Sequence, residues 1–236
     1  MPSESYKLGK QKHKNAFNNF NLATIQPRNE LQRNVLDSQN DLVLHGCPGT
    51  GKTFLALYIF LKRLLRGDTE KIVIVRSAVG TRDVGHMPGT LAEKLKIYEG
   101  PYRDICTELF GRGDVYDNFK SKGKIDFIST SNIRGKTLRN CCVLIDEFSN
   151  MTYHELRSII TRLAEVDGVI FSGDVQQTDI RNNGVEDFVG ILEKMEEYPF
   201  DICNFGPEHI VRSGLVREFI EIEYESSNKQ QNLFRR

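Results

Sequence analysis

The stretch GCPGTGKT, residues 46–53, decides the fold. The five residues before it, DLVLH (41–45), are mostly apolar and predict a short buried strand, and apolar residues recur at helical spacing over residues 54–65. A glycine-rich loop between a strand and a helix is the context of a phosphate-binding loop, whose backbone N–H groups point at phosphate oxygens. The first ligand to expect is therefore a nucleoside triphosphate.

The residue types within this loop fit that ligand. Its glycines let the backbone turn sharply, and the helix that starts near Lys52 adds the positive end of its dipole. We expect Lys52 to reach the β- and γ-phosphates and Thr53 to hold Mg²⁺. The nucleotide-binding residues predicted here are Gly46, Pro48, Gly49, Thr50, Gly51, Lys52, Thr53 and Phe54. The alternative is a loop that binds some other phosphate or none.

An acidic pair follows a second apolar strand. The strand CVLI, residues 142–145, ends in Asp146 and Glu147, which looks like a Walker B element. Two adjacent carboxylates at the end of a buried strand are costly to desolvate without a positive partner, and a Mg²⁺ ion bridging Thr53 and Asp146 would supply one. We expect Asp146 to be a metal ligand and Glu147 to orient or deprotonate the attacking water. Alternatively, the pair is the acidic cap of a following helix.

A third apolar strand, residues 169–171, runs into SGDVQQ, residues 172–177. The block GDVQQ resembles a motif of superfamily 1 helicases, in which the Asp and the Gln lie beside the γ-phosphate. This resemblance gives Asp174 and Gln177 the role of γ-phosphate sensors. Gly followed by Asp is also common turn chemistry. The GDVQQ block is informative because of its position. It lies at the end of a strand, about 27 residues past the acidic pair, and open α/β sheets bind their ligands at the ends of their strands.

Taken in order along the chain, a series of short blocks resembles the PhoH-like ATPases, a family related to the first domain of superfamily 1 helicases. The resemblance runs from about Ala23 to Tyr224. The phosphate loop is generic to many families, but GHMPG (85–89), RGKTL (134–138) and VRSGLV (211–216) are specific to this one. The other matching positions are Asn29, Gln32, Arg76, Glu93, Lys94, Pro101, Tyr102, LIDEFSNMT (144–152) and SGDVQQTD (172–179).

The resemblance implies roles for four further residues. Gln32 would read the adenine edge, although an ordinary helix-surface glutamine is the alternative. Arg212 would stabilise charge on the transferring phosphoryl group, in its own chain or in a neighbouring subunit, with a surface salt bridge as the alternative. Arg76 and Arg134 are candidates for contacts with nucleic acid or with the nucleotide, and the resemblance does not choose between the two.

The chain of 236 residues suffices for one α/β domain and is too short for two helicase-type domains. We expect a flexible N-terminal tail over residues 1–22, the ATPase domain over 23–225 and a disordered C-terminal tail over 226–236. A monomeric helicase places its nucleotide site between two domains. A chain with a single domain therefore needs another copy of itself to supply the second side of that site. We therefore predict a homo-oligomer, and the resemblance suggests a ring, with a hexamer as one arrangement.

The pattern along the chain predicts an α/β, RecA-like P-loop NTPase fold, with a mostly parallel sheet and helices on both faces. The expected strands are residues 41–45, 71–75, 124–128, 142–145, 169–172 and 201–205. The expected helices are residues 28–36, 51–66, 90–110, 153–164, 185–196 and 215–222. Residues 111–123 carry three glycines and predict the longest loop, either a mobile arm or a passive surface segment.

The charge balance and the cysteine content limit the expected partners and the expected cellular compartment. The 32 basic and 32 acidic residues balance, so no whole-protein field draws the chain to nucleic acid. Basic residues between Lys7 and Lys14 precede Phe17 and Phe20, a pattern that suits a grip on a single strand or a solvated tail. The five cysteines show no metal-ligand spacing, and with no signal peptide or long apolar span they favour a reduced, cytoplasmic protein that contacts no membrane.

Three functions from different classes remain. The first is an ATPase that uses Mg²⁺ and couples hydrolysis to binding or remodelling RNA or single-stranded DNA. The second is a small-molecule kinase, which should carry an arginine-rich lid and a base near the acceptor. The third is a slow nucleotide-dependent switch that acts on protein partners, which the neutral charge favours over strong nucleic-acid binding. Stimulation of turnover by nucleic acid separates the first from the third.

Overall fold

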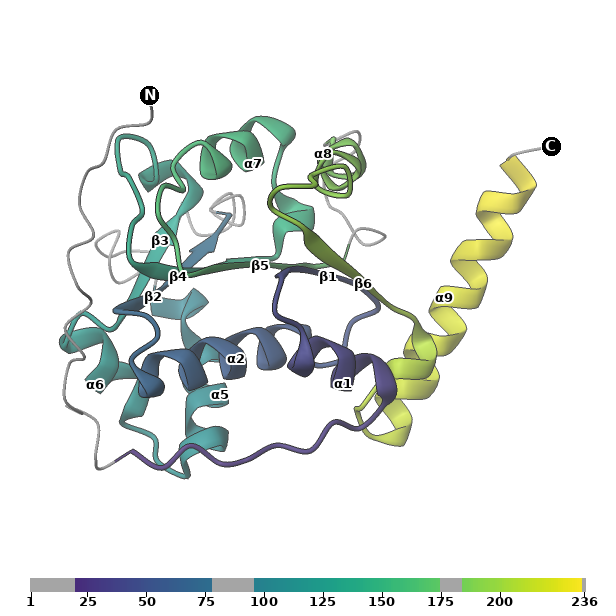
Figure 1. Ribbon diagram of the computed structural model, residues 1–236. Coiled ribbons are helices and arrows are strands. Elements are labelled where there is room, and N and C mark those ends of the chain that lie inside the picture. Colours follow the sequence, from purple (N-terminus) through teal and green to yellow (C-terminus); the bar gives the residue numbers. More distant parts are fainter. Residues whose placement is uncertain (1–19, 78–95, 175–183, 235–236) are drawn as a thin grey trace, which may run out of the picture.

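A computed structural model describes residues 20–77, 96–174 and 184–234 of the chain (Figure 1). Six strands form one sheet in the order β3-β2-β4-β5-β1-β6, and every strand pair is parallel. The strands are β1 Asp41–Gly46, β2 Lys71–Arg76, β3 Ile125–Ser129, β4 Cys141–Asp146, β5 Gly168–Gly173 and β6 Phe200–Phe205. Each begins within one residue of its predicted start, which confirms the predicted parallel sheet.

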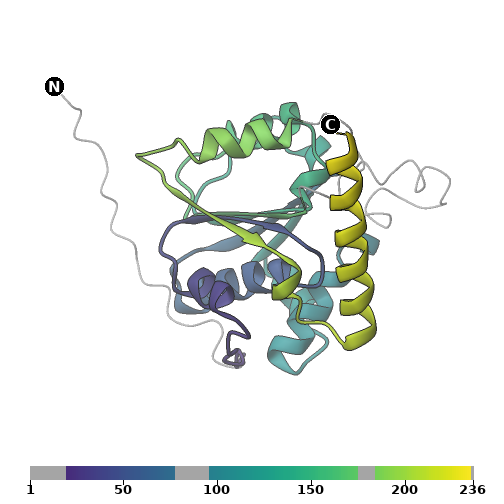
Figure 2. The ribbon, with the colours of Figure 1, turned by 90° about the vertical axis from the view of Figure 1, so that its right-hand side faces the viewer.

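Helices cover both faces of this sheet (Figures 1 and 2). One face carries α1 Glu30–Asp37, α2 Lys52–Arg66, α5 Gly100–Phe110 and α6 Val115–Ser121. The other face carries α7 Tyr153–Ile160 and α8 Val185–Leu192. The long helix α9, Gly214–Phe234, follows β6 and its C-terminal half projects from the body. This architecture confirms the predicted α/β fold of the RecA-like P-loop class.

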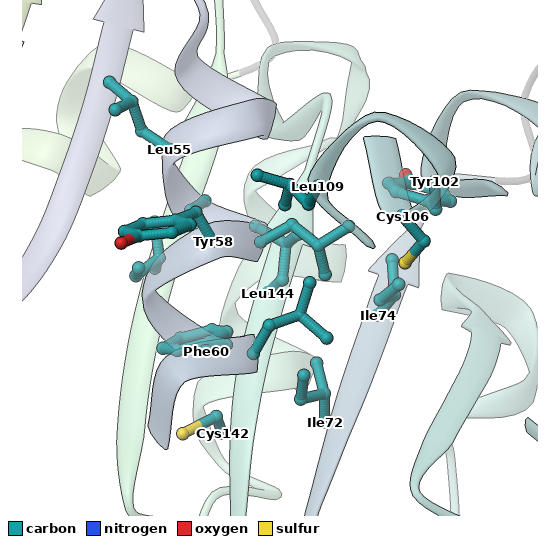
Figure 3. Packing of buried hydrophobic residues seen from close by; sticks show 14 of the residues in the cluster. Leu55, Tyr58, Phe60, Ile72, Ile74, Tyr102, Cys106, Leu109, Cys142 and Leu144 are labelled. Atoms are coloured by element: carbon teal, nitrogen blue, oxygen red, sulfur yellow. The ribbon is translucent and has the colours of Figure 1, made fainter. Parts of the chain in front are cut away.

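Alternate residues of the central strands supply two separate cores. Ile72, Ile74 and Leu144 point to the α2 and α5 side, where they belong to the same buried cluster as Tyr58 and Tyr102 (Figure 3). The residues between them on the same strands pack on the other face, under α7 and α8. A parallel sheet covered on both faces requires apolar side chains at nearly every central position. That requirement is why the strands read as continuous apolar runs in the sequence.

The register of the sheet gathers polar strand ends at one edge. Gly46 pairs with Phe205, Arg76 with Asp146, and Asp146 with Ser172. Because all six strands are parallel, their carboxyl ends lie along the same side of the molecule. The phosphate-binding loop and the acidic pair are therefore neighbours in space.

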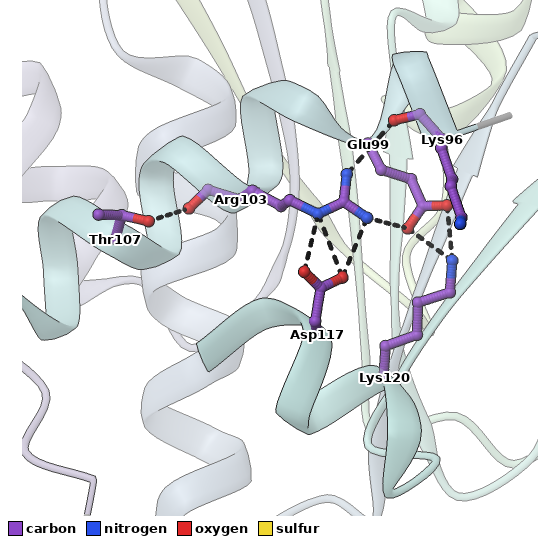
Figure 4. A network of polar contacts seen from close by, with 6 residues as sticks. All are labelled: Lys96, Glu99, Arg103, Thr107, Asp117 and Lys120. Atoms are coloured by element: carbon purple, nitrogen blue, oxygen red, sulfur yellow. Dashed lines mark hydrogen bonds and ion pairs between the residues drawn. The ribbon is translucent and has the colours of Figure 1, made fainter. Parts of the chain in front are cut away.

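Residues 111–123, expected to be a long loop, contain helix α6 instead. Val115, Tyr116 and Phe119 are buried, so one side of this short helix packs into the core. Polar contacts hold its other side to α5: Lys120 binds the buried Glu99 carboxylate, and Arg103 binds Asp117 (Figure 4). The prediction was wrong because the glycines lie outside the helix: Gly111 caps the end of α5 and Gly123 follows α6, both with positive φ angles.

Residues at the inner end of each predicted tail have a defined place in the structure. Phe20 lies 4.9 Å from the ring of Phe119 and 6.1 Å from that of Phe110, and Leu22 packs on the same cluster. Phe20 is thus a core-packing residue and is not free to stack on a base, while the predicted basic grip before it lies outside the described residues. At the other end α9 continues to Phe234, because residues 221–234 hold no proline or glycine to stop it.

Other helix boundaries differ by a few residues. The start predicted for the helix at residues 90–110 falls outside the described residues, and α5 itself begins at Gly100. Helices α7 and α8 end at Ile160 and Leu192, four residues before their predicted ends. All five cysteines are free and buried. Within the described residues, no helix combines the length and the apolar character needed to cross a membrane.

The packing of α6 makes a prediction about stability. Replacing Phe119 by Ala removes a fully buried ring that contacts two other aromatic side chains. We expect a loss of about 3–5 kcal/mol in the free energy of unfolding, measured by urea denaturation. Tyr198→Ala is the control, because that aromatic side chain is 69% exposed and its removal should cost little. Equal losses in the two variants would contradict the assignment of α6 to the core.

Candidate nucleotide site

The loop between β1 and α2 has the backbone of a phosphate cradle. Gly46 and Gly49 adopt φ angles of 112° and 74°, which disfavour any residue with a side chain. A Cβ atom at Gly46 would lie 2.2 Å from the carbonyl oxygen of Phe205, so the loop also needs glycine there to pass close to β6. The loop leads directly into α2, which begins at Lys52. Backbone N–H groups and the helix N-terminus therefore converge on the same space.

Lys52 folds back onto its own loop. Its Nζ atom donates to the carbonyl oxygens of Gly46 and Cys47, both at 2.7 Å. Burial lowers the pKa of Lys52 below its usual value, while the carboxylates of Asp174 and Glu147 act in the opposite direction. The ammonium group thus stands in a partly desolvated position among acidic side chains. A phosphate entering the loop would find this cation within reach.

Contacts from outside brace the loop. Gln32 of α1 donates from Nε2 to the carbonyl oxygen of Thr50 at 3.0 Å and accepts at Oε1 from the N–H of Arg28 at 2.9 Å. On the other side, the N–H of Val211 donates to the carbonyl oxygen of Gly49 at 3.0 Å. Gln32 is only 5% exposed and holds backbone at both ends of its amide. The contact of Gln32 with adenine stays a prediction. One N–H of its amide group is already bonded to Thr50, so the other N–H would have to make that contact.

The carboxylate of Asp146 is fixed by two hydroxyl groups. Thr53 donates to Oδ1 at 2.9 Å, and Tyr102 donates to Oδ2 at 2.7 Å. Ser172, at the end of the intervening strand β5, has its Oγ 3.3 Å from that of Thr53. Mg²⁺ prefers oxygen ligands and is usually held by one or two protein groups together with substrate phosphates. Thr53 and Asp146 fit such a site, as the sequence predicts.

Tyr102 is a site residue whose role the sequence did not reveal. It lies in α5, 44 positions before Asp146, and is fully buried. Burial and the adjacent Asp146 charge raise the pKa of Tyr102 well above its usual value, so its hydroxyl stays protonated and donates. The signal in the sequence was the Pro101–Tyr102 pair among the family blocks. That signal carried no indication of which group the hydroxyl would bind.

Glu147 has an unusual backbone conformation for a residue with a side chain. Its φ and ψ angles are 54° and 41°, in the left-handed region, and it precedes the 3₁₀ turn Phe148–Asn150. Such strain at a non-glycine residue is typical of functional sites. Burial and the neighbouring Asp146 raise the pKa of Glu147 above its usual value, while Arg76 and Lys52 act to lower it. The carboxylate is 42% exposed and faces the cavity.

The structure separates the two arginines whose roles were open. Arg76, at the end of β2, reaches within 3.9 Å of the Glu147 carboxylate and lines the nucleotide cavity. Arg134 lies elsewhere, in a second hollow beside α7. Only Arg76 is therefore placed to act on the nucleotide or on the acidic pair.

The γ-phosphate sensors predicted from GDVQQ are only partly described. Asp174 lines the cavity, and its backbone N–H donates to Ser149 Oγ at 3.2 Å, which joins the end of β5 to the turn after Glu147. Gln177 lies outside the described residues, as does the GHMPG block with Glu93 and Lys94. The sensing role of Asp174 and Gln177 stays a prediction.

One cavity of about 1530 Å³ is lined by Gln32, Lys52, Thr53, Arg76, Asp146, Glu147 and Asp174. Arg212 lines it from the segment after β6, and a Cβ atom at Gly49 would lie 2.9 Å from its Cγ. The predicted Pro48 and Phe54 line it too. Its walls also include apolar and aromatic residues that the sequence did not single out, which are Ile25, Pro27, Ile105, Ile220 and Tyr224, together with charged residues such as Asp104 and Glu108.

Cys47, inside the loop, is not a reactive thiol. It is buried, and that burial raises its pKa to about 11. A thiolate is the nucleophilic form of cysteine, and this environment disfavours it. Cys47 is therefore a passive occupant of its loop position.

Comparison with known proteins agrees with this geometry. The family model described as PhoH-like protein matches residues 24–224. A PhoH-like protein of Synechocystis is 32% identical over 187 residues, 78% of this chain and 56% of the relative. Protein PhoH of Escherichia coli K12 is 30% identical over 199 residues, 82% of this chain and 56% of the relative. A PhoH-like protein of Bacillus subtilis is 31% identical over 194 residues, 80% of this chain and 60% of the relative. The chain thus spans little more than half the length of these curated relatives.

The Tyr102 contact predicts a change in metal dependence. Tyr102→Phe removes the hydroxyl that orients Asp146 Oδ2 and leaves the ring in place. Groups that orient a metal ligand commonly contribute about 10–100-fold to metal affinity or activity. We expect the Mg²⁺ concentration for half-maximal nucleotide binding to rise by about tenfold.

The matched control is Tyr58→Phe, which alters another buried tyrosine of the same core. It should leave the Mg²⁺ dependence unchanged. An unaltered Mg²⁺ requirement in Tyr102→Phe would show that Asp146 is held in place without the tyrosine.

Proposed function

Because the chain belongs to the PhoH-like protein family, we propose that it hydrolyses ATP with Mg²⁺ and couples the reaction to binding or remodelling RNA or single-stranded DNA. The observation that carries the proposal is the placement of Glu147 beside the Thr53–Asp146 pair and Lys52. A partly exposed carboxylate next to a phosphate cradle suits activation of water. Family membership supports a P-loop ATPase-like protein.

Each residue around the γ-phosphate has its own role in the proposed reaction. Lys52 leaves the Gly46 and Cys47 carbonyls and binds β- and γ-phosphate oxygens. Thr53 and Asp146 would hold Mg²⁺, and the bound ion would supply positive charge that offsets the negative charge of the phosphates. Glu147 accepts a proton from the attacking water, because its raised pKa brings it closer to that of a useful base.

Arg212 supplies a further positive charge at the phosphates. Its side chain lies against Gly49 of the same chain, which supports action in its own subunit rather than in a neighbour. Guanidinium groups in this position stabilise charge that appears only in the transition state. Asp174 and Gln177 complete the scheme as reporters of the γ-phosphate.

Apolar and aromatic side chains in the cavity wall support a seat for the base. Ile25 and Pro27 from the segment before α1, Phe54 from α2 and Tyr224 from α9 line the cavity. Flat apolar and aromatic surfaces suit an adenine ring. Gln32 also lines the cavity and donates to the phosphate loop at Thr50, so adenine binding and loop position would be linked through its amide.

Helix α9 supports the proposed homo-oligomer. Leu215, Phe219 and Ile222 are 81%, 66% and 58% exposed and recur at helical spacing on a helix that projects from the body. Exposed apolar surface of this kind marks interaction sites. We propose that a second copy covers it, in a ring for which a hexamer is one arrangement. The free, buried cysteines suit the reducing cytoplasm.

Two variants test the proposed reaction. Lys52→Ala removes the only loop cation that contacts the cradle carbonyls and should abolish ATP binding, whereas Glu147→Gln should keep binding and lower turnover by about 10²–10⁴-fold. Phosphate release is measured with and without single-stranded RNA and DNA, and binding with a fluorescent ATP analogue. Stimulation by a polymer supports the coupled ATPase. Tight ATP binding by Lys52→Ala contradicts the site, and turnover indifferent to both polymers favours a switch acting on protein partners.

The acid limb of the pH profile tests the base. Glu147 works only when it is deprotonated, so kcat should fall as the pH falls through the pKa of its carboxyl group. Arg76 lowers this pKa by its charge. Arg76→Gln should therefore move the acid limb to higher pH. A limb that stays in place, or moves to lower pH, would show that another group controls it.

A further inference from the structure

A second hollow, of about 240 Å³, lies beside helix α7 and is lined by basic and hydroxyl side chains. Its six lining residues are Arg134, His154, Arg157, Ser158, Thr161 and Arg162. None of the six is a carboxylate or an apolar side chain, although the chain as a whole has a net charge of zero. This composition provides hydrogen-bond donors and positive charge for an anion.

The arginines of this hollow have no carboxylate partner within the described residues. Three other arginines with side chains at the surface do have one: Arg103 pairs with Asp117, Arg112 with Asp114 and Arg217 with Glu221. Arg134, Arg157 and Arg162 take part in no such pair in the described part of the chain, and the Nε of Arg162 is buried without a hydrogen-bond acceptor. Three guanidinium groups close together repel one another, so an anion between them would be stabilising.

The backbone that carries these side chains is firmly held. Ile133 and Leu138 are buried, and they hold the two ends of the exposed tip at residues 134–137. The N–H of Leu138 donates to the carbonyl oxygen of Arg162 at 2.9 Å, and the N–H of Ala164 donates back to Leu138 at 3.0 Å. Arg134 and Arg162 thus sit on segments that are bonded to each other. A site arranged in advance loses less entropy when it binds.

The hollow is distinct from the nucleotide cavity. The two share no lining residue. A short segment of chain nevertheless connects residues of the two sites. Glu147 lines the nucleotide cavity, and α7, which carries residues of the hollow, begins six positions later at Tyr153. The helix is anchored by a capping box between Thr152 and Glu155, and Thr130 at the end of β3 also binds Glu155 at 2.8 Å.

We propose that this hollow binds backbone phosphates of single-stranded nucleic acid, an inference that rests on the polymer-coupled function proposed above. The hollow has no Phe, Tyr or Trp side chain in its lining and is far smaller than the nucleotide cavity, so its size suits a phosphate group rather than a nucleotide. Guanidinium forks match phosphate oxygens in pairs. Contacts of this kind position a strand without reading its sequence. The polymer would lie against α7, directly after the segment that holds Glu147.

The test compares a double variant, Arg134→Ala with Arg157→Ala, with the wild-type chain and with Arg33→Ala. Arg134 and Arg157 are exposed, so their removal does not threaten the core. Arg33 is an exposed arginine on α1, on the opposite face of the sheet. Binding of fluorescent single-stranded RNA and DNA of equal length and mixed sequence is measured at several salt concentrations, and ATP turnover is measured without polymer.

We expect the double variant to bind RNA, DNA or both about tenfold more weakly than wild type at moderate salt. The slope of log affinity against log salt should fall by about 1.4, since each phosphate contact on a single strand contributes about 0.7. Arg33→Ala should match wild type in both respects. Basal turnover should be equal in all three proteins, and the comparison of polymers identifies which strand the hollow prefers.

Three results would overturn the proposal, and they differ in what they say about the function. Unchanged affinity and slope in the double variant, with wild type binding a polymer, would reject the hollow and leave the coupled ATPase standing. Loss of basal turnover in the double variant would show that these arginines act on the nucleotide site. Failure of the wild type to bind either polymer would reject both the hollow and the proposed coupling, while its basal turnover would still report on hydrolysis.

Discussion

The two hydrogen bonds to Asp146, from Thr53 and from Tyr102, join the parts of the molecule that make the nucleotide site. Strand β5 lies between β1 and β4, so Thr53 has to reach across the end of β5 to meet the acidic strand. Tyr102 approaches the same carboxylate from α5 on one face of the sheet. Because each carboxylate oxygen accepts a hydrogen bond, the orientation of the Asp146 side chain is fixed. The same two bonds link the start of α2, which follows the phosphate loop, and helix α5 to the strand that carries Asp146 and leads to Glu147.

A single stretch of chain connects the acidic pair, at the edge of the sheet, to helix α7. Asp146 ends β4, Glu147 takes a left-handed conformation, and the 3₁₀ turn leads through the Thr152 cap into α7. Ser149 within this turn accepts from the N–H of Asp174, so the end of β5 is bonded to the same stretch. Packed and hydrogen-bonded segments of this kind can carry coupling between two sites. In the account proposed here, the polymer and the γ-phosphate act on opposite ends of this stretch.

The sequence was sufficient to predict the parallel sheet and the phosphate loop, because both depend on local chemistry. Buried parallel strands need apolar runs, and a cradle needs glycines, lysine and threonine at set spacing. Tyr102 could be noticed but not assigned, because its partner lies on another strand and only the fold brings them together. Helix α6 was missed because its core-facing residues are few and lie between glycines. Gln32 was given a ligand role, yet in the structure its amide bonds to backbone, a use that no single-residue pattern distinguishes.

We propose that residues 46–53 form a triphosphate cradle whose lysine is held on loop carbonyls until the ligand binds. A crystal structure of the chain with Mg²⁺ and a non-hydrolysable ATP analogue would decide this. We expect Lys52 Nζ to leave the carbonyl oxygens of Gly46 and Cys47, now 2.7 Å away, for β- and γ-phosphate oxygens. We also expect the metal ion between Thr53 and Asp146. A nucleotide bound elsewhere, or a lysine still bonded to the loop with the phosphates in place, would contradict it.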